Sequence, residues 1–208
     1  MSAVQLPDTP ARRTLVISCG ALAGDIRAVV NMGGWEHVDF EYLPANLHNR
    51  PEQITPALQN LLSARADDYA QVVIGYGDCG TGGHLDDLLE RYPHATRLPG
   101  DHCYAFFTGI DRFLEQFHGE LGTFFLTDYL VKHQDTLIFG ALGLTDHPEL
   151  TEMYFGNYTR VLYIAQNPSP ELTEAAQSCA TRLNLSFDQL DAGRGLLETH
   201  ILDLRVPA

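Results

Sequence analysis

The sequence predicts an α/β fold: a single domain built on a mainly parallel, doubly wound sheet with helices on both faces. Short apolar, β-branched runs alternate with segments whose apolar residues recur at helical spacing. Turn residues, and no long linkers, separate these segments, so that strand, helix and strand follow one another as in crossover connections. We expect the domain to cover residues 13–208, after a flexible leader at 1–12.

The predicted strands are short apolar runs bounded by turn residues. The run at 71–76 is apolar enough to be buried on both faces, which is typical of a central parallel strand. The run at 38–43 alternates apolar and acidic residues, which indicates a strand near an edge. Strands are expected at 14–18, 38–43, 71–76, 97–99, 160–165 and 185–190, with an aromatic segment at 122–126.

The predicted helices carry their apolar residues on one face. In the segment 51–64, Ile54, Leu58, Leu61 and Leu62 follow helical spacing. Helices are expected at 21–30, 51–64, 85–92, 110–117 and 170–183, with another that starts near Thr127.

Charge and hydropathy exclude several classes of protein. The 208 residues carry a net charge of −14, from 13 Lys and Arg against 27 Asp and Glu. Nucleic-acid binding needs a basic stripe, and the densest basic cluster is Arg12–Arg13, so neither nucleic acid nor an anionic membrane is expected as a partner. The apolar runs are too short to span a bilayer, and the first residues lack a signal-peptide pattern. We therefore expect a cytoplasmic protein.

Three of the four cysteines share one position relative to the predicted strands. Cys19, Cys79 and Cys103 each follow the carboxyl end of a strand, and in a parallel sheet these ends border one crevice where ligands bind. We expect the three thiols to converge there. Cys179 lies on a predicted helix face and fits a buried core position. Without a secretion signal, no disulfide framework is expected.

Glycines flank two of these cysteines. Gly20 follows Cys19, and Gly77 and Gly80 stand on either side of Cys79. Glycine lets backbone N–H groups turn inward, where they stabilise anions such as thiolates or cluster sulfurs. We expect Gly20, Gly77 and Gly80 to contact a bound cofactor. The loop lacks the lysine and the spacing of a phosphate-binding loop.

A site with three cysteines leaves one coordination position open. Catalytic zinc sites keep such a position, and a [4Fe-4S] cluster held by three cysteines exposes one iron. The sequence therefore predicts zinc or a [4Fe-4S] cluster at Cys19, Cys79 and Cys103. Two alternatives remain. The cysteines can be three unrelated buried residues, or Cys79 or Cys103 can act as a metal-free nucleophile with His102 or His84 as its base.

Two histidines are the candidate catalytic residues. His48 follows a strand and precedes a helix, so it faces the same crevice edge; a loop histidine that caps the helix is the alternative. His102 adjoins Cys103 and is a candidate ligand or proton donor, or simply exposed. We expect His48 and His102 to orient a ligand or move protons.

Several segments together resemble the DUF1638 family, a domain of unknown function in bacteria and archaea. The matching segments are 17–22, 47–52, 75–80, 103–109, 122–127 and 190–197. The resemblance implies a single domain that shares the three cysteines. The family usually shows Asp before its third cysteine, where this chain has His102. Relatives are often encoded near corrinoid-dependent methyltransferases, which implies a link to corrinoid-dependent methyl transfer.

The residues and the resemblance together predict a metal-dependent accessory enzyme. Its partners would be a small molecule or a corrinoid methyltransferase component, and the open position would take a thiol, a carboxylate or a corrinoid-linked group. The alternative is a non-catalytic protein that uses the same crevice to bind a cofactor or to dock on a methyltransferase.

Overall fold

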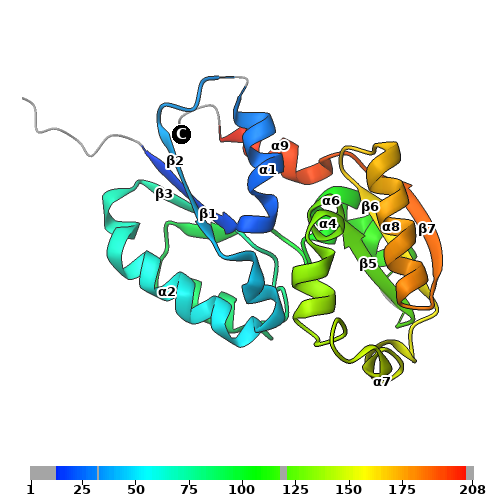
Figure 1. Ribbon diagram of the computed structural model, residues 1–208. Helices are drawn as coiled ribbons and strands as arrows, with labels where there is room; N and C mark the ends of the chain where they lie inside the picture. Colours follow the sequence, from blue (N-terminus) through cyan, green and yellow to red (C-terminus); the bar gives the residue numbers. More distant parts are fainter. Residues whose placement is uncertain (1–12, 32, 118–120, 205–208) are drawn as a thin grey trace, which may run out of the picture.

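The computed structural model describes residues 13–31, 33–117 and 121–204, arranged around two parallel sheets (Figure 1). The α/β class and the parallel pairing of the strands are confirmed. The strands are divided between a four-stranded and a three-stranded sheet, a division that the run of strands and helices did not reveal. The predicted leader at 1–12 lies outside the described residues.

Strands β1 (Thr14–Cys19), β2 (Val38–Leu43), β3 (Gln71–Gly75) and β4 (Ala95–Arg97) form the first sheet in the order β2-β1-β3-β4. All six residues of β1 are buried, because β2 and β3 flank it in the sheet. The predicted edge position of β2 is confirmed. At the carboxyl end, Ser18 pairs with Gly75, where an added Cβ would lie only 2.5 Å from the Ser18 hydroxyl.

Helices next to the first sheet bury one apolar face each. The segment expected at 21–30 begins as a 3-10 turn and continues as α1, and the one expected at 51–64 likewise becomes a 3-10 turn and α2. In α2, Ile54, Leu58 and Leu62 are buried. The bounds are α1 Ala23–Val30, the 3-10 turn Ala45–Asn49, α2 Ile54–Arg65 and α3 His84–Leu89.

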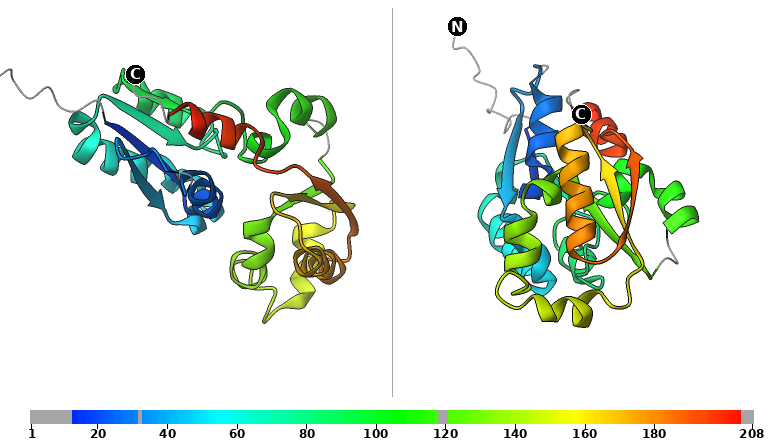
Figure 2. Two further views of the ribbon diagram at one scale, coloured as in Figure 1. Left: turned by 90° about the horizontal axis from the view of Figure 1, so that it is seen from above. Right: turned by 45° about the vertical axis from the view of Figure 1, so that its right-hand side comes forward.

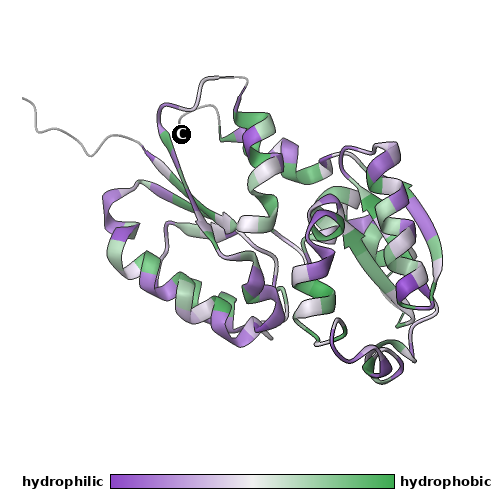
Figure 3. Cartoon of the chain, viewed as in Figure 1, coloured by the Kyte–Doolittle hydropathy of each residue, from purple (hydrophilic) through white to green (hydrophobic). Residues whose placement is uncertain are grey.

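Strands β5 (Thr123–Thr127), β6 (Arg160–Ala165) and β7 (Ser186–Asp191) form the second sheet in that order. Helices α6 (Asp128–Lys132), α7 (Thr151–Phe155) and α8 (Pro170–Arg182) and the π-helical turn Asp135–Gly140 belong to this half. Apolar residues line β5 and β6, whereas β7 is largely polar (Figure 3). Cys179 is fully buried in this core, as expected of a helix-packing residue.

Helices α4 (Tyr104–Thr108), α5 (Ile110–Phe117) and α9 (Gly195–Asp203) connect the two halves. After β7 the chain returns, and α9 packs against α1 and α4 (Figure 2). Leu197 and Ile201 of α9 join the core of the first sheet, together with Leu162 and Ile164 of β6. In the described part of the chain, no helix is long and apolar enough to cross a membrane.

Candidate three-cysteine site

The three cysteines lie at the carboxyl edge of the first sheet. Cys19 is the last residue of β1, Cys79 lies in the loop after β3, and Cys103 precedes α4. Burial is the main cause that raises the pKa of Cys19 and of Cys103; Cys79 adds to the shift of Cys19, and Cys79 and Cys19 both add to the shift of Cys103. The structure therefore brings the thiols within electrostatic reach of one another, although 60 and 24 positions separate them in the chain.

Cys19 is buried and held by two polar contacts. Its Sγ accepts a hydrogen bond from the backbone N–H of Ala21 at 3.3 Å and lies 3.4 Å from Nδ1 of His48. Burial is the main cause that raises the pKa of Cys19 to about 11, and the Ala21 N–H opposes it. Without a cation nearby, this thiol is protonated at neutral pH.

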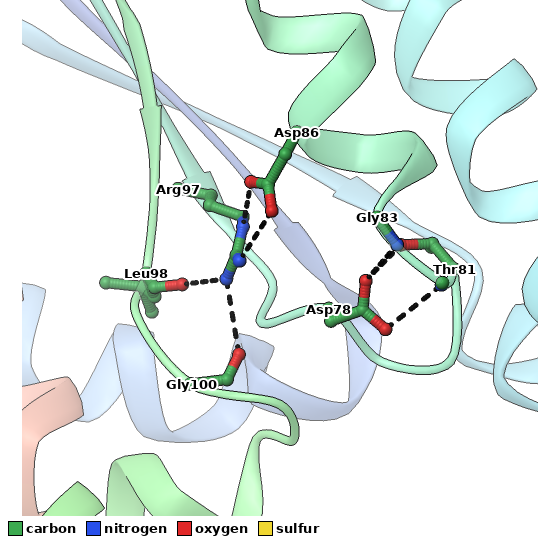
Figure 4. A network of polar contacts seen from close by, with 8 residues as sticks. Asp78, Thr81, Gly83, Asp86, Arg97, Leu98 and Gly100 are labelled. Atoms are coloured by element: carbon green, nitrogen blue, oxygen red, sulfur yellow. Dashed lines mark hydrogen bonds and ion pairs between the residues drawn. The ribbon is translucent and has the colours of Figure 1, made fainter.

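The loop after β3 is organised by Asp78. Its carboxylate accepts hydrogen bonds from the Thr81 hydroxyl at 2.8 Å and from the backbone N–H groups of Gly82 and Gly83 at 3.1 and 2.8 Å (Figure 4). Burial acts to raise the pKa of Asp78, but these donors outweigh it and the pKa is lowered. The loop holds Cys79 at a φ of 51°, in the left-handed region that few non-glycine residues adopt. Such backbone strain clusters at functional sites.

A second loop, after β4, closes on the first. The guanidinium of Arg97 binds both carboxylate oxygens of Asp86, at 2.5 and 2.9 Å, and donates to the carbonyls of Leu98 and Gly100 (Figure 4). The backbone N–H of Cys79 donates to the Asp101 carbonyl at 2.7 Å. Together with the hydrogen bond from the backbone N–H of Asp78 to the Gly100 carbonyl at 3.0 Å, this bond holds the loop after β4 against the loop that carries Cys79, while Arg97 braces the loop after β4 on α3.

The three glycines expected to contact a cofactor all have close neighbours within the protein, backbone atoms at Gly20 and Gly77 and a side chain at Gly80. An added Cβ would lie 2.7 Å from the Gly100 carbonyl at Gly77, and 3.0 Å from the Leu43 carbonyl at Gly20. Gly80 has a φ of +82° and packs against Pro51. Packing and backbone conformation explain these glycines, and their contact with a cofactor stays a prediction.

Tyr76 is the site residue that the sequence analysis missed. Its side chain is 1% exposed, and its hydroxyl has no hydrogen-bond partner among the described residues. Burial raises its pKa, and the thiols of Cys19, Cys79 and Cys103 raise it further. The Cys19 thiol interacts with this hydroxyl strongly enough to shift the pKa of both groups, but the contact does not meet the geometry of a hydrogen bond. A usable signal was present: Tyr76 ends an apolar strand directly before the glycine-rich loop, and buried tyrosine hydroxyls normally find a partner.

The histidines divide into one inside the site and others at its rim. His48 stacks on Tyr76, with ring centroids 6.4 Å apart, and burial and nearby His102 lower its pKa. His102 is exposed, with its ring 6.1 Å from that of Tyr104. His84 is exposed and faces Asp87 at 3.6 Å. Among the described residues, neither His102 nor His84 pairs with a thiol, and the contacting pair is Cys19 with His48.

A cavity of about 220 Å³ lies between the two halves of the molecule. Cys103 and His48 contribute to its wall, so the cavity adjoins the three-cysteine site. The lining residues are Ala21, Ala45, His48, Asn49, Cys103, Tyr104, Phe124, Thr127, Tyr129, Leu130, Leu137, Ile138 and Leu142. This set contains no Asp, Glu, Lys or Arg.

Residues 42–201, most of the chain, match the model of a family that is described as "Protein of unknown function (DUF1638)". The chain belongs to this family. The DUF1638 match includes His48, Tyr76, Cys79 and Cys103, and it begins after Cys19. No curated protein and no solved structure matches the chain.

The three cysteines of this DUF1638 protein are the type of ligand that a soft cation prefers, because thiolates select zinc and iron–sulfur clusters. Within residues 13–31, 33–117 and 121–204, however, no three His, Cys, Asp or Glu side chains stand in the arrangement that a metal ion requires. The thiols are gathered and protonated, and they do not point at one common centre.

Proposed function

We propose that Cys19, Cys79 and Cys103 bind a soft metal centre, zinc or a [4Fe-4S] cluster, and that the protein is a metal-dependent accessory enzyme. The observation that carries the proposal is the hydroxyl of Tyr76, which is buried without a partner beside three thiols. A buried polar group without a partner costs about 1–3 kcal/mol, so a group bound at this place would stabilise the protein.

The raised pKa values of the thiols support this proposal. Burial is the main cause that raises the pKa of each thiol, neighbouring thiols add to it for Cys19 and Cys103, and a bound cation would instead deprotonate them. Metal binding then needs each thiol to lose its proton and to rotate about its Cα–Cβ bond toward a common point. Cys19 has an acceptor for that proton in contact, Nδ1 of His48.

The chain's own residues define what the site would do. When bound, the metal supplies Lewis acidity and lowers the pKa of a thiol or water in the open position. His48, held against Tyr76, accepts a proton at the imidazole, and Tyr76 donates a hydrogen bond to the bound group. Exposed His102 stands at the rim and exchanges protons with solvent. The four free cysteines fit a reducing compartment, and we place the protein in the cytoplasm.

A second candidate, a non-catalytic protein that binds a small molecule or docks on a corrinoid methyltransferase component, draws support from the cavity. The cavity has a largely apolar wall, and no Asp, Glu, Lys or Arg is among its lining residues, which suits holding an apolar ligand. Turnover of a small-molecule thiol by the metal-loaded protein would favour the enzyme. Tight association with a corrinoid protein and no turnover would favour the binding protein.

Metal content of anaerobically purified protein tests the proposal. Wild type should carry a fixed amount of zinc or of iron and sulfide per chain, and serine at Cys19, Cys79 or Cys103 should abolish it. Cys179→Ser is the matched control, because this thiol is buried in the other core and should leave the metal content unchanged. Metal-free wild type, or metal loss in Cys179→Ser alone, would contradict the proposal.

A further inference from the structure

We infer that the cavity between the two halves binds an uncharged, largely apolar small molecule. The ligand would serve the binding function given above as the second candidate, on which this inference rests, and it needs no metal centre. Three features of the cavity support it: walls from both halves, a π-helical turn in one of these walls, and a lining without Asp, Glu, Lys or Arg.

Both halves of the molecule contribute to the wall of the cavity. The first half supplies Ala21 and residues of the 3-10 turn Ala45–Asn49, and the second half supplies residues of β5, α6 and the π-helical turn Asp135–Gly140. The side-chain amide of Asn49 donates a hydrogen bond to the Leu137 carbonyl at 3.4 Å, which joins the two walls directly. A molecule in this cavity is therefore contacted from two sides, as in ligand sites between domains.

The wall from the second half is aliphatic and aromatic. Leu130, Leu137, Ile138 and Leu142 line it together with Phe124. Ile138 is 3% exposed and belongs to the core of the second sheet, so this wall is continuous with a packed interior. An apolar ligand that lies against it removes its own apolar surface from water, which favours binding.

The π-helical turn is a second, independent sign of a ligand site. The backbone N–H of Ala141 donates to the carbonyl of Thr136, five residues earlier, at 3.1 Å, as a π-helix requires. Such turns are rare and are frequent at functional sites. Here the turn supplies Leu137 and Ile138 to the lining of the cavity, so the irregular backbone lies where the ligand would bind.

The cavity offers no partner to a charged ligand. A carboxylate or an ammonium group would lose its hydration there without gaining an ion pair with Asp, Glu, Lys or Arg. His48 is the basic side chain in the lining, and its Nδ1 already lies 3.4 Å from Sγ of Cys19. A neutral polar group such as a hydroxyl loses less hydration, and the side chains of Asn49 and Thr127 can hydrogen-bond to it.

Calorimetric titration of the purified protein at neutral pH tests the inference with 1-hexanol, hexanoate, hexylammonium and 1-propanol. 1-Hexanol should bind about tenfold more tightly than either ion, which has a similar chain but a charge. It should also bind more tightly than 1-propanol, which has less apolar surface to bury. Equal binding of an ion would overturn the uncharged class, and equal binding of 1-propanol would overturn the apolar class. Absence of saturable 1-hexanol binding would overturn the site.

A lysine placed in the wall tests the location. Leu142 is only partly buried, and Leu142→Lys would give hexanoate an ion pair, so the preference for 1-hexanol over hexanoate should fall about tenfold or reverse. Met153→Lys is the matched control: it changes the net charge equally, at a side chain that is 66% exposed and outside the lining, and should leave the preference unchanged.

A second variant, Ala45→Leu, fills the cavity without adding charge and should weaken 1-hexanol binding. Unchanged binding in Ala45→Leu, or an unchanged preference in folded Leu142→Lys, would overturn the location. Metal content of the same wild-type preparation tests the metal centre separately. Binding of 1-hexanol to a protein that holds no metal would refute the metal-dependent proposal alone, and metal without 1-hexanol binding would refute this inference alone.

Discussion

The carboxyl edges of the two sheets each bury a polar side chain, but they satisfy it in opposite ways. In the second sheet, Asp128 follows β5 and is 6% exposed. Its carboxylate accepts hydrogen bonds from the Tyr163 hydroxyl at 2.7 Å and from the backbone N–H groups of Gln166 and Asn167 at 3.0 and 2.9 Å. In the first sheet, Tyr76 follows β3, and within the described part of the chain its hydroxyl has no hydrogen-bond partner.

This difference separates a structural polar group from a candidate functional one. The partners of Asp128 come from the end of β6, so the carboxylate joins neighbouring strand ends and needs no ligand. Tyr76 lies among three thiols with its hydrogen-bonding capacity unused, which is the state expected of a group that meets a ligand. The carboxyl edge of a parallel sheet can therefore carry a buried group that joins strand ends in one half and a candidate binding group in the other.

The largest effect should come from removing the carboxylate of Asp128, which joins the strand ends of the second sheet. Asp128→Ala leaves the hydroxyl of Tyr163 and the backbone N–H of Gln166 buried without an acceptor and removes the acceptor of the Asn167 N–H, so we expect a loss of about 3 kcal/mol in the free energy of unfolding. Urea denaturation measures it, and Asp128→Asn, which keeps an acceptor oxygen, should lose less. The metal content of the folded fraction should not change. A decrease of less than about 1 kcal/mol in the free energy of unfolding of Asp128→Ala would mean that the Asp128 carboxylate does not hold these strand ends together.

A smaller effect should follow from placing a methyl group between the loops after β3 and β4 at the three-cysteine site. In Gly77→Ala the new Cβ would lie 2.7 Å from the Gly100 carbonyl, so the loops must separate at a cost of about 1–3 kcal/mol. Metal content should fall as well, because Cys79 lies in the loop after β3 and Cys103 follows the loop after β4. Gly24→Ala is the control: its Cβ meets nothing within 4 Å in α1, and it should stabilise the helix by up to about 1 kcal/mol. Unchanged metal binding in Gly77→Ala would show that loop contact does not position the thiols.

The sequence predicted most strands of both sheets because their signals are local, although the segment at 122–126 was expected only as aromatic and forms β5, and the strand expected at 97–99 lies two residues earlier as β4. Apolar runs at 14–18 and 160–165 became β1 and β6, and the amphipathic segment 110–117 became α5 with the same bounds. The division into two sheets was not predictable, because strand pairing depends on contacts between distant segments. Helices α4 and α9 were missed for a related reason: their buried residues pack on each other and on α1, and tertiary contacts, more than local pattern, hold them.

The candidate site was predicted in position but not in detail. Strand ends located Cys19 and Cys79, since topology alone places them at one edge. The contact between Cys19 and His48 depends on how the 3-10 turn Ala45–Asn49 folds back, which no spacing rule gives. The sequence places Tyr76 at the end of a strand beside the glycine-rich loop, but that its hydroxyl lacks a partner can be recognised only when all neighbours are known.

The smallest and sharpest test compares two tyrosine hydroxyls, each removed by phenylalanine. Both side chains are almost fully buried, so the substitutions create similar packing. Tyr163→Phe removes the 2.7 Å donor of Asp128 and should lower the free energy of unfolding by about 1–2 kcal/mol. Tyr76→Phe removes a hydroxyl without a partner, so the metal-free protein should keep its stability or gain about 1 kcal/mol.

The same pair of variants reports on the bound state. If Tyr76 donates a hydrogen bond to a group at the three-cysteine site, Tyr76→Phe should weaken metal retention, whereas folded Tyr163→Phe should retain metal as wild type does. Urea denaturation of chelator-treated protein and metal analysis of the loaded protein separate the two effects. Equal destabilisation by both substitutions in the metal-free protein would mean that the Tyr76 hydroxyl already has a partner, and the contrast between the two sheet edges would then fail.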